Sequence, residues 1–214
     1  MFRGEVSALP KVTDLHRERR RQAILDAAQA VFVQKGYQLA TIDEIAARSA
    51  LSVGAIYRYF PTKSDIMLTL LEERLGRGPE LFHRLTGEGG SAWQRLSRCV
   101  DLFVTALRVR HPGTGRLLLA AWGEALQDRT VRLGLQERYQ GLVDYMRGVI
   151  EAGVAQGEFR RNPDPAVLAE LLVAMADGAT LAWSIGTPGL DLRRMRASAL
   201  AMFRAYLCPA QGEE

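Results

Sequence analysis

The sequence predicts an all-α protein, and three observations support that fold class. Apolar residues recur at spacings of three and four through most of the 214 residues, as on one face of a helix. Glycine and proline separate these stretches, and Ser, Thr or Asp precedes several of them as a helix cap would. No convincing strand pattern, tandem repeat or heptad run is present. We expect about nine helices in total.

Composition narrows the classes of protein that the chain can be. Hydrophobic residues make up 48% and charged residues 24%, as in a globular protein that needs no disulfide or metal for its core. Cys99 and Cys208 are far apart, and His16, His83 and His111 are scattered. A disulfide scaffold, a cysteine-built zinc site and a histidine-pair metal site are therefore excluded. We expect neither a metal nor a cofactor.

Charge and hydropathy bear on partners and location. The net charge of +4 permits a nucleic-acid partner without requiring one. Residues 1–10 lack the apolar core of a signal peptide. The most apolar long stretch, 165–186, is interrupted by Glu170 and Asp177, which favours a buried helix over a membrane span. We expect a cytoplasmic protein that binds no membrane.

The N-terminal third predicts a short arm and then a long helix. Residues 1–14 mix glycine, proline and charge without periodicity, so we expect a flexible arm there. From Leu15 to Lys35 the apolar positions have helical spacing, and Gly36 ends the helix. These apolar positions are Ile24, Ala27, Ala28, Val31 and Phe32.

Three shorter helices are expected next. Thr41 and Glu44 form a capping box that begins a helix over 41–49, and Ser52 caps a second helix that ends at Phe60. Pro61 and a second capping box, Thr62 to Asp65, begin a connecting helix over 63–75.

The remaining chain predicts a larger helical region. Gly76 to Pro79 indicates a domain boundary, and the glycine-rich stretch 87–91 is interpreted as a linker because it lacks the Gly-Lys-Ser/Thr ending of a phosphate loop. Helices are then predicted at 92–110, 114–126, 129–156, 164–186 and 191–207.

The two short helices around residue 50 predict a helix-turn-helix. They are joined by a tight turn and braced by the longer first helix. The second has the size that fits a DNA major groove. Its face presents small residues that allow close approach of the backbone, and side chains that donate hydrogen bonds: Ser52, Val53, Gly54, Ala55, Tyr57, Arg58 and Tyr59.

Residues 23–67 resemble the TetR family of transcriptional regulators. The resemblance is carried by an ordered series: Ala27-Ala28, Phe32, Gly36-Tyr37, Thr41-Ile42-x-x-Ile45-Ala46, Ser52-x-Gly54, Ile56-Tyr57-x-Tyr59-Phe60 and Lys63. The turn departs from the family pattern, because Ala50 stands where glycine is usual. If the turn requires a positive φ, Ala50 costs about 1 kcal/mol of stability.

The resemblance implies roles for several residues. Thr41 matches a phosphate-binding position, and Tyr57 and Tyr59 match a pair that holds phosphates. Lys63 matches a phosphate contact, and Ser52, Val53, Gly54 and Ala55 match the base-facing turn.

Two further DNA-contact hypotheses come from side-chain chemistry. Arg58 has the chemistry to read guanine, although simple exposure is the alternative. Arg17 and Arg20 belong to an arginine-rich run that either adds contacts to the DNA backbone or minor groove or forms a solvated helix face.

The C-terminal two thirds resemble a TetR subgroup that includes betaine-responsive regulators, through Asp177-Gly178 and Pro188-x-x-Asp191. The family places an effector cavity there, and ordinary core packing is the alternative for each candidate wall: Phe103, Trp122, Tyr145, Met146 and Met175. Small residues spaced by four indicate close helix approach, which suits a homodimer seam or intrachain packing. The predicted dimer-interface residues are Ala174, Gly178, Ala182, Leu200 and Phe203.

Together these expectations divide the chain into an arm (1–14), a helix-turn-helix DNA-binding domain (15–62), a connecting helix (63–78) and an effector-binding and dimerisation domain (79–214). The predicted function is a DNA-binding regulator, a homodimeric repressor released from an inverted-repeat operator by a small apolar or aromatic effector. No nucleophile–base pair, metal spacing or carboxylate pair indicates an enzyme. The alternative is an all-α adaptor or ligand-binding protein that uses the helix-turn-helix only as a scaffold.

Overall fold

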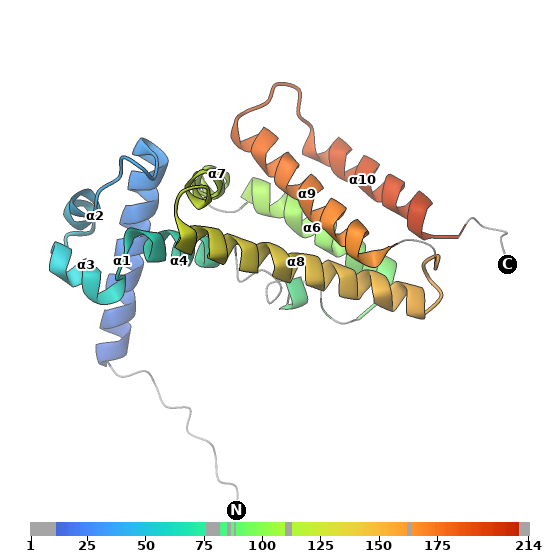
Figure 1. Cartoon of the computed structure of the whole chain (residues 1–214), viewed down its shortest axis with the longest axis horizontal. Coiled ribbons are helices and arrows are strands. Elements are labelled where there is room, and N and C mark those ends of the chain that lie inside the picture. Colours follow the sequence, from blue (N-terminus) through green and yellow to red (C-terminus); the bar gives the residue numbers. More distant parts are fainter. Residues whose placement is uncertain are drawn as a thin grey trace, which may run out of the picture. The chain divides into compact units, whose positions relative to one another are not determined.

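The computed structural model describes residues 12–75, 82–84, 87, 89–109, 113–161 and 164–209 (Figure 1). All regular secondary structure within these ranges is helical, which confirms the all-α prediction. The flexible arm expected over residues 1–14 is wrong for residues 12–14, which are helical; its residues 1–11 and the boundary expected at 76–79 fall outside the described residues. The chain divides into two compact units, Met1–Thr69 and Leu70–Glu214.

The N-terminal unit holds α1 (Val12–Lys35), α2 (Ile42–Ser49), α3 (Val53–Tyr59) and the first half of α4 (Lys63–Leu75). Helix α1 begins three residues earlier than expected, and the carboxylate of Asp14 suits the positive end of the helix dipole in that first turn. The core of this unit takes its side chains from all four helices: Ile24, Leu25, Ala28, Phe32, Ile45, Ile56 and Met67.

Side-chain caps begin the short helices as the sequence predicts. The backbone N–H of Glu44 donates to Oγ1 of Thr41 at 3.3 Å, and the N–H of Thr41 donates to Oε2 of Glu44 at 3.2 Å. The N–H of Ala55 donates to Oγ of Ser52 at 3.2 Å, so Ser52 caps α3. These bonds satisfy donors that a helix of seven or eight residues otherwise leaves to water.

The turn between α2 and α3 adopts a left-handed conformation at Ala50. Its φ is 55° and its ψ is 33°, and it is the one non-glycine residue with positive φ among the described residues. The departure from glycine at this position therefore carries the backbone strain that the sequence predicts, about 1 kcal/mol.

The C-terminal unit is built around α8 (Arg129–Ala155), which packs against α6 (Ala92–Val109), α7 (Thr114–Ala125) and α9 (Pro165–Ser184) (Figure 1). The last helix, α10 (Leu192–Leu207), packs against α6. The inward faces of α6, α8, α9 and α10, together with Phe159 after α8, form one apolar core that includes Leu96, Met146, Ile150 and Leu172.

The outer face of α9 remains apolar and exposed. Its large exposed side chains include Val167, Leu171, Met175 and Leu181, and exposed Ile185 follows directly after the helix. By length and composition alone α9 would be able to cross a membrane, and it is the one described helix with that property. Exposed apolar helix faces are typical of contact surfaces.

Candidate DNA-binding site

Two apolar side chains anchor helix α3 in the core, and its other faces are exposed or half-buried. Ile56 is fully buried, and Phe60, which caps the helix end, is 4% exposed. The exposed residues are Ser52, Gly54, Tyr57 and Arg58, whereas Val53, Ala55 and Tyr59 are half-buried. All seven residues predicted for the reading face therefore retain accessible surface.

The folded chain does not require glycine at position 54. A Cβ built on Gly54 meets no atom within 4 Å, and its φ is an ordinary helical value. Glycine inside a helix costs about 1 kcal/mol relative to alanine, and no intramolecular contact offsets that cost here. The missing side chain leaves room for close approach by something outside the subunit.

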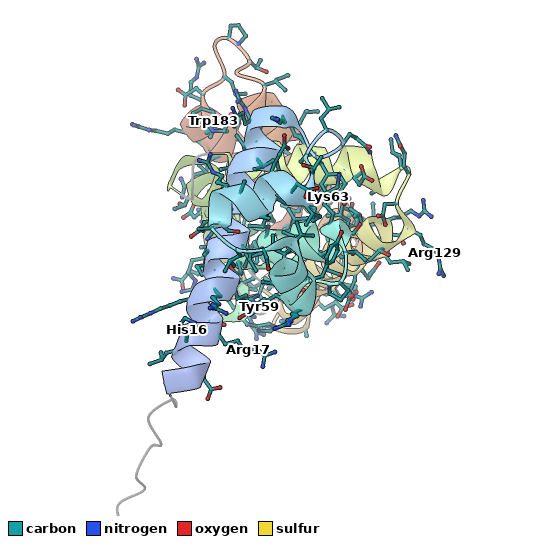
Figure 2. The ribbon with its side chains drawn as sticks, turned by 90° about the vertical axis from the view of Figure 1, so that its left-hand side faces the viewer. His16, Arg17, Tyr59, Lys63, Arg129 and Trp183 are labelled. Atoms are coloured by element: carbon teal, nitrogen blue, oxygen red, sulfur yellow. The ribbon has the colours of Figure 1, made fainter. Side chains whose placement is uncertain are left out.

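Three further predicted DNA contacts lie on exposed surface of α1 and at the start of α2. Thr41, Arg17 and Arg20 are all exposed, and Thr41 also makes the cap described above. Figure 2 shows Arg17 on the first turns of α1 and Tyr59 at the end of α3, both carried by the N-terminal unit.

The side chain of Lys63 makes hydrogen bonds and a cation–π contact within the protein. Its Nζ donates to the backbone carbonyl oxygen of Tyr37 at 2.8 Å and to that of Ala40 at 3.0 Å. The carbonyl oxygen of Gln38 lies at 3.5 Å, and Nζ stands 4.3 Å from the centroid of the Tyr37 ring. The sequence alone gave no sign of these partners, which lie 23 to 26 residues earlier in the chain.

The structure separates the five predicted effector-pocket residues into two groups. The ring centroids of Phe103 and Tyr145 lie 5.0 and 5.9 Å from that of Phe82. Met146 is buried in the core cluster that includes Phe82. Trp122 and Met175 are 47% and 42% exposed. Phe82 is a member of this aromatic cluster that sequence reasoning missed, because no helical periodicity surrounds it.

A shallow surface depression also lies at the connection between α9 and α10. It is lined by Trp183, Gly189, Leu190, Asp191, Leu192 and Arg193, and it includes none of the predicted pocket residues.

The predicted dimer-interface residues differ in their exposure. Ala174 and Gly178 are exposed on α9, and Ala182 and Leu200 are half-buried. Phe203 differs from the expectation, since it is 7% exposed and belongs to the core cluster of its own subunit. Helix α10 is apolar on two sides, and the side that carries Met202 and Tyr206 is the exposed one.

Asp177 lies half-buried on α9 near α8. Burial raises the pKa of its carboxyl group to about 6, and the positive charge of Arg138 partly opposes that rise. Across from it, burial and the negative charges of Asp177 and Glu170 raise the pKa of Tyr139. A carboxylate in this setting is costly to hold charged at neutral pH.

Comparison with known proteins decides what these two units are. The profile of the bacterial regulatory proteins of the tetR family matches residues 24–70, and that of the C-terminal region of BetI-type transcriptional repressors matches residues 92–207. The chain belongs to the TetR family. It is a ligand-responsive, DNA-binding transcriptional regulator of that family, as predicted from its helix-turn-helix and from the resemblance to the family.

Relatives of this TetR-family protein extend over most of its length. The HTH-type transcriptional regulator YfiR of Bacillus subtilis is 30% identical over 79% of this chain and 82% of its own. The fatty acid metabolism regulator of the same organism is 24% identical over 84% of this chain and 91% of its own.

Solved TetR-family structures share the fold. A transcriptional regulator of Saccharomonospora viridis, crystallised with choline, is 27% identical with a TM-score of 0.74 and covers 91% of this chain and 100% of its own. FadR of Bacillus subtilis, crystallised with stearoyl-CoA, has a TM-score of 0.70 and covers 85% of this chain and 96% of its own. At 22% identity FadR supports the fold alone.

Proposed function

We propose that this TetR-family regulator is a homodimeric repressor that binds an inverted-repeat operator and releases it when a small molecule binds the C-terminal unit. The observation that carries the DNA-binding half is the outer face of α3, where Gly54 leaves open space beside exposed Tyr57 and Arg58. A short helix that is anchored on one side and open on the other suits insertion into a major groove.

The DNA contacts that we propose divide by chemistry. The turn from Ser52 to Ala55 faces base edges, and the Arg58 guanidinium donates to guanine O6 and N7. Phosphate contacts come from the side chains of Thr41, Tyr57 and Tyr59 and from the charges of Arg17 and Arg20. Phosphate contacts position the protein, whereas the base-facing turn selects the sequence.

A second copy of the chain is the occupant that we propose for the exposed face of α9. Apolar side chains of α9 and α10 are exposed together with the small residues Ala174 and Gly178. A Cβ at Gly178 meets nothing within 4 Å, so close approach from outside the subunit is sterically free. Two helices from each subunit would cover these faces, and two-fold symmetry is the commonest arrangement of soluble oligomers.

Such a dimer predicts the form of the operator. Each α3 would enter one major groove, so the half-sites form an inverted repeat with centres about 34–36 Å apart or somewhat more. A monomer would recognise a single half-site without symmetry.

We propose an apolar or aromatic effector, because Phe82, Phe103 and Tyr145 bring three aromatic rings together beside Met146 in the C-terminal unit. Rings and methionine adapt to varied apolar shapes. The half-buried carboxylate of Asp177 favours a second candidate, a quaternary ammonium compound such as the choline bound by the Saccharomonospora viridis regulator.

Selection of genomic DNA fragments by the purified protein tests this function. The expected result is enrichment of one or a few fragments that share an inverted repeat, with bound DNA released by a compound from a panel of aromatic compounds, acyl-CoA esters and quaternary ammonium compounds. Enrichment of no sequence over random fragments would overturn the proposal and favour the scaffold-only alternative.

A further inference from the structure

The ammonium group of Lys63 is hydrogen-bonded to the backbone of one short segment. A lysine side chain has three N–H donors, and the carbonyl oxygens of Tyr37, Gln38 and Ala40 lie at 2.8, 3.5 and 3.0 Å from Nζ. The Tyr37 ring provides a further cation–π contact at 4.3 Å. A phosphate would have to compete with these contacts for the same donors.

The position of Lys63 in its helix also favours a role for its carbonyl contacts in the folded protein. It is the first residue of α4, where the helix dipole disfavours a positive charge. The converging carbonyl oxygens offset that cost. They converge because Gly36, with φ of +80°, ends α1 and turns the chain back toward α2.

The side chain of Ser64, next to Lys63, also holds the segment that contains Tyr37. The hydroxyl groups of Tyr37 and Ser64 are hydrogen-bonded at 3.1 Å, and these residues are only 5% and 7% exposed. The Tyr37 ring also packs on Phe32 of α1, with centroids 5.2 Å apart. Two consecutive residues of α4 thus hold the connection between α1 and α2.

We infer that Lys63 is a positioning residue that fastens the 36–40 connection to the start of α4 and so fixes Thr41, the cap of α2. This inference rests on the proposed DNA-binding function and assigns Lys63 a role other than phosphate contact. Helix α4 runs from the N-terminal unit into the C-terminal unit. A shift of its first turn would therefore be transmitted to the start of the helix-turn-helix through these bonds.

The test compares Lys63→Met with Arg17→Met, a matched loss of one positive charge on an exposed site of the same unit. Hydrogen exchange of the free protein is measured at the amides of residues 40–45, and operator affinity is measured at several salt concentrations. For Lys63→Met we expect about tenfold faster exchange at these amides and weaker operator binding, with the slope of log affinity against log salt unchanged. For Arg17→Met we expect unchanged exchange and a slope smaller by about one.

Unchanged exchange in Lys63→Met, together with a slope smaller by about one, would overturn the inference and make Lys63 a phosphate contact. Lys63→Gln removes the same charge but keeps a polar side chain, and serves if Lys63→Met fails to fold. It should accelerate exchange at residues 40–45 with an unchanged salt slope, and unchanged exchange would count against the inference. If the wild type binds no specific DNA, the proposed function fails, and the exchange data still decide the role of Lys63.

Discussion

The carboxylate of Glu158 accepts a hydrogen bond from the backbone N–H of Trp93 at 3.0 Å. The same carboxylate accepts one from the N–H of Ala92 at 2.6 Å, so a residue that follows α8 caps the start of α6. Burial alone would raise the pKa of Glu158, but these bonds and one with the Ser91 side chain together lower it. The cap joins the start of α6 to a residue that lies 65 positions after Trp93 in the sequence.

Replacing this cap should destabilise the C-terminal unit. We expect Glu158→Gln to lower the free energy of unfolding at pH 7 by about 1 kcal/mol, because a charged acceptor at a helix N-terminus is lost. The pKa of Glu158 is lowered only in the folded state. The extra unfolding free energy of the wild type is therefore complete at neutral pH and is lost as pH falls through that pKa. Urea unfolding of both proteins at pH 7 and pH 3 measures this. Glu137→Gln, on exposed α8 surface, is the control, and an equal loss in that control would contradict the capping role.

The left-handed turn predicts a stabilising substitution. Ala50→Gly should raise the free energy of unfolding by about 1 kcal/mol, because glycine adopts φ of 55° without the Cβ clash. Ala47→Gly is the matched control, since Ala47 is exposed inside α2 and should lose about 1 kcal/mol. Thermal unfolding of the two variants should therefore shift in opposite directions. A shift in the same direction would mean that the turn carries no strain.

Gly54 should show a conflict between stability and function. Gly54→Ala fills open space in a helix, so we expect a gain of up to about 1 kcal/mol in unfolding free energy together with weaker operator binding. Gly148→Ala, on an exposed turn of α8 where a Cβ also meets nothing, should give a similar gain and leave DNA binding unchanged. Operator affinity of Gly54→Ala equal to that of the wild type would place α3 away from the DNA.

The α9 seam can be tested by sedimentation. Gly178→Leu should shift the wild-type dimer toward monomer at micromolar concentration, because the leucine side chain blocks close approach of a second helix. Gly148→Leu adds the same bulk on α8 and should leave the dimer intact. If both variants sediment as the wild type does, the subunits meet on another surface.

Asp177 should make stability depend on pH in the opposite sense to Glu158. Burial raises the pKa of its carboxyl group from the ordinary value of 3.8 to about 6 in the folded state. Between pH 3.8 and pH 6 the folded protein therefore keeps a proton on this group that the unfolded chain has already lost. The free energy of unfolding should therefore rise as pH falls from 7 to about 4, by roughly 2–3 kcal/mol from this group. Asp177→Asn should stabilise the protein at pH 7 and remove that rise. A pH profile identical to the wild type would mean that Asp177 is solvated.

The local chemistry of caps and turns made most of the fold predictable. Thr41, Ser52 and Asp164 each cap the helix that the sequence predicted, and Gly36 ends α1 as expected. These signals act within four residues along the chain, so a single sequence contains them. The strain at Ala50 was predictable for the same reason.

Contacts between distant segments were not predictable. The carbonyl partners of Lys63 depend on how the 36–40 connection folds back on α4, which no local pattern encodes. Helix α10 carries apolar residues on two sides, so its rotation, which buries Phe203 and exposes Met202, depends on packing against α6. Exposed Met175 on α9 was assigned to the pocket for a similar reason.

Fluorescence anisotropy of a selected operator duplex and of a scrambled duplex of equal length and composition tests the DNA-reading role of α3 most directly. Both duplexes are titrated with the wild type and with Arg58→Ala at one fixed salt concentration. We expect the wild type to bind the operator about a thousandfold or more tighter than the scrambled duplex, and Arg58→Ala to lose about 1–3 kcal/mol of that preference while binding the scrambled duplex as before. Equal wild-type affinity for the two duplexes would contradict sequence-specific recognition through α3.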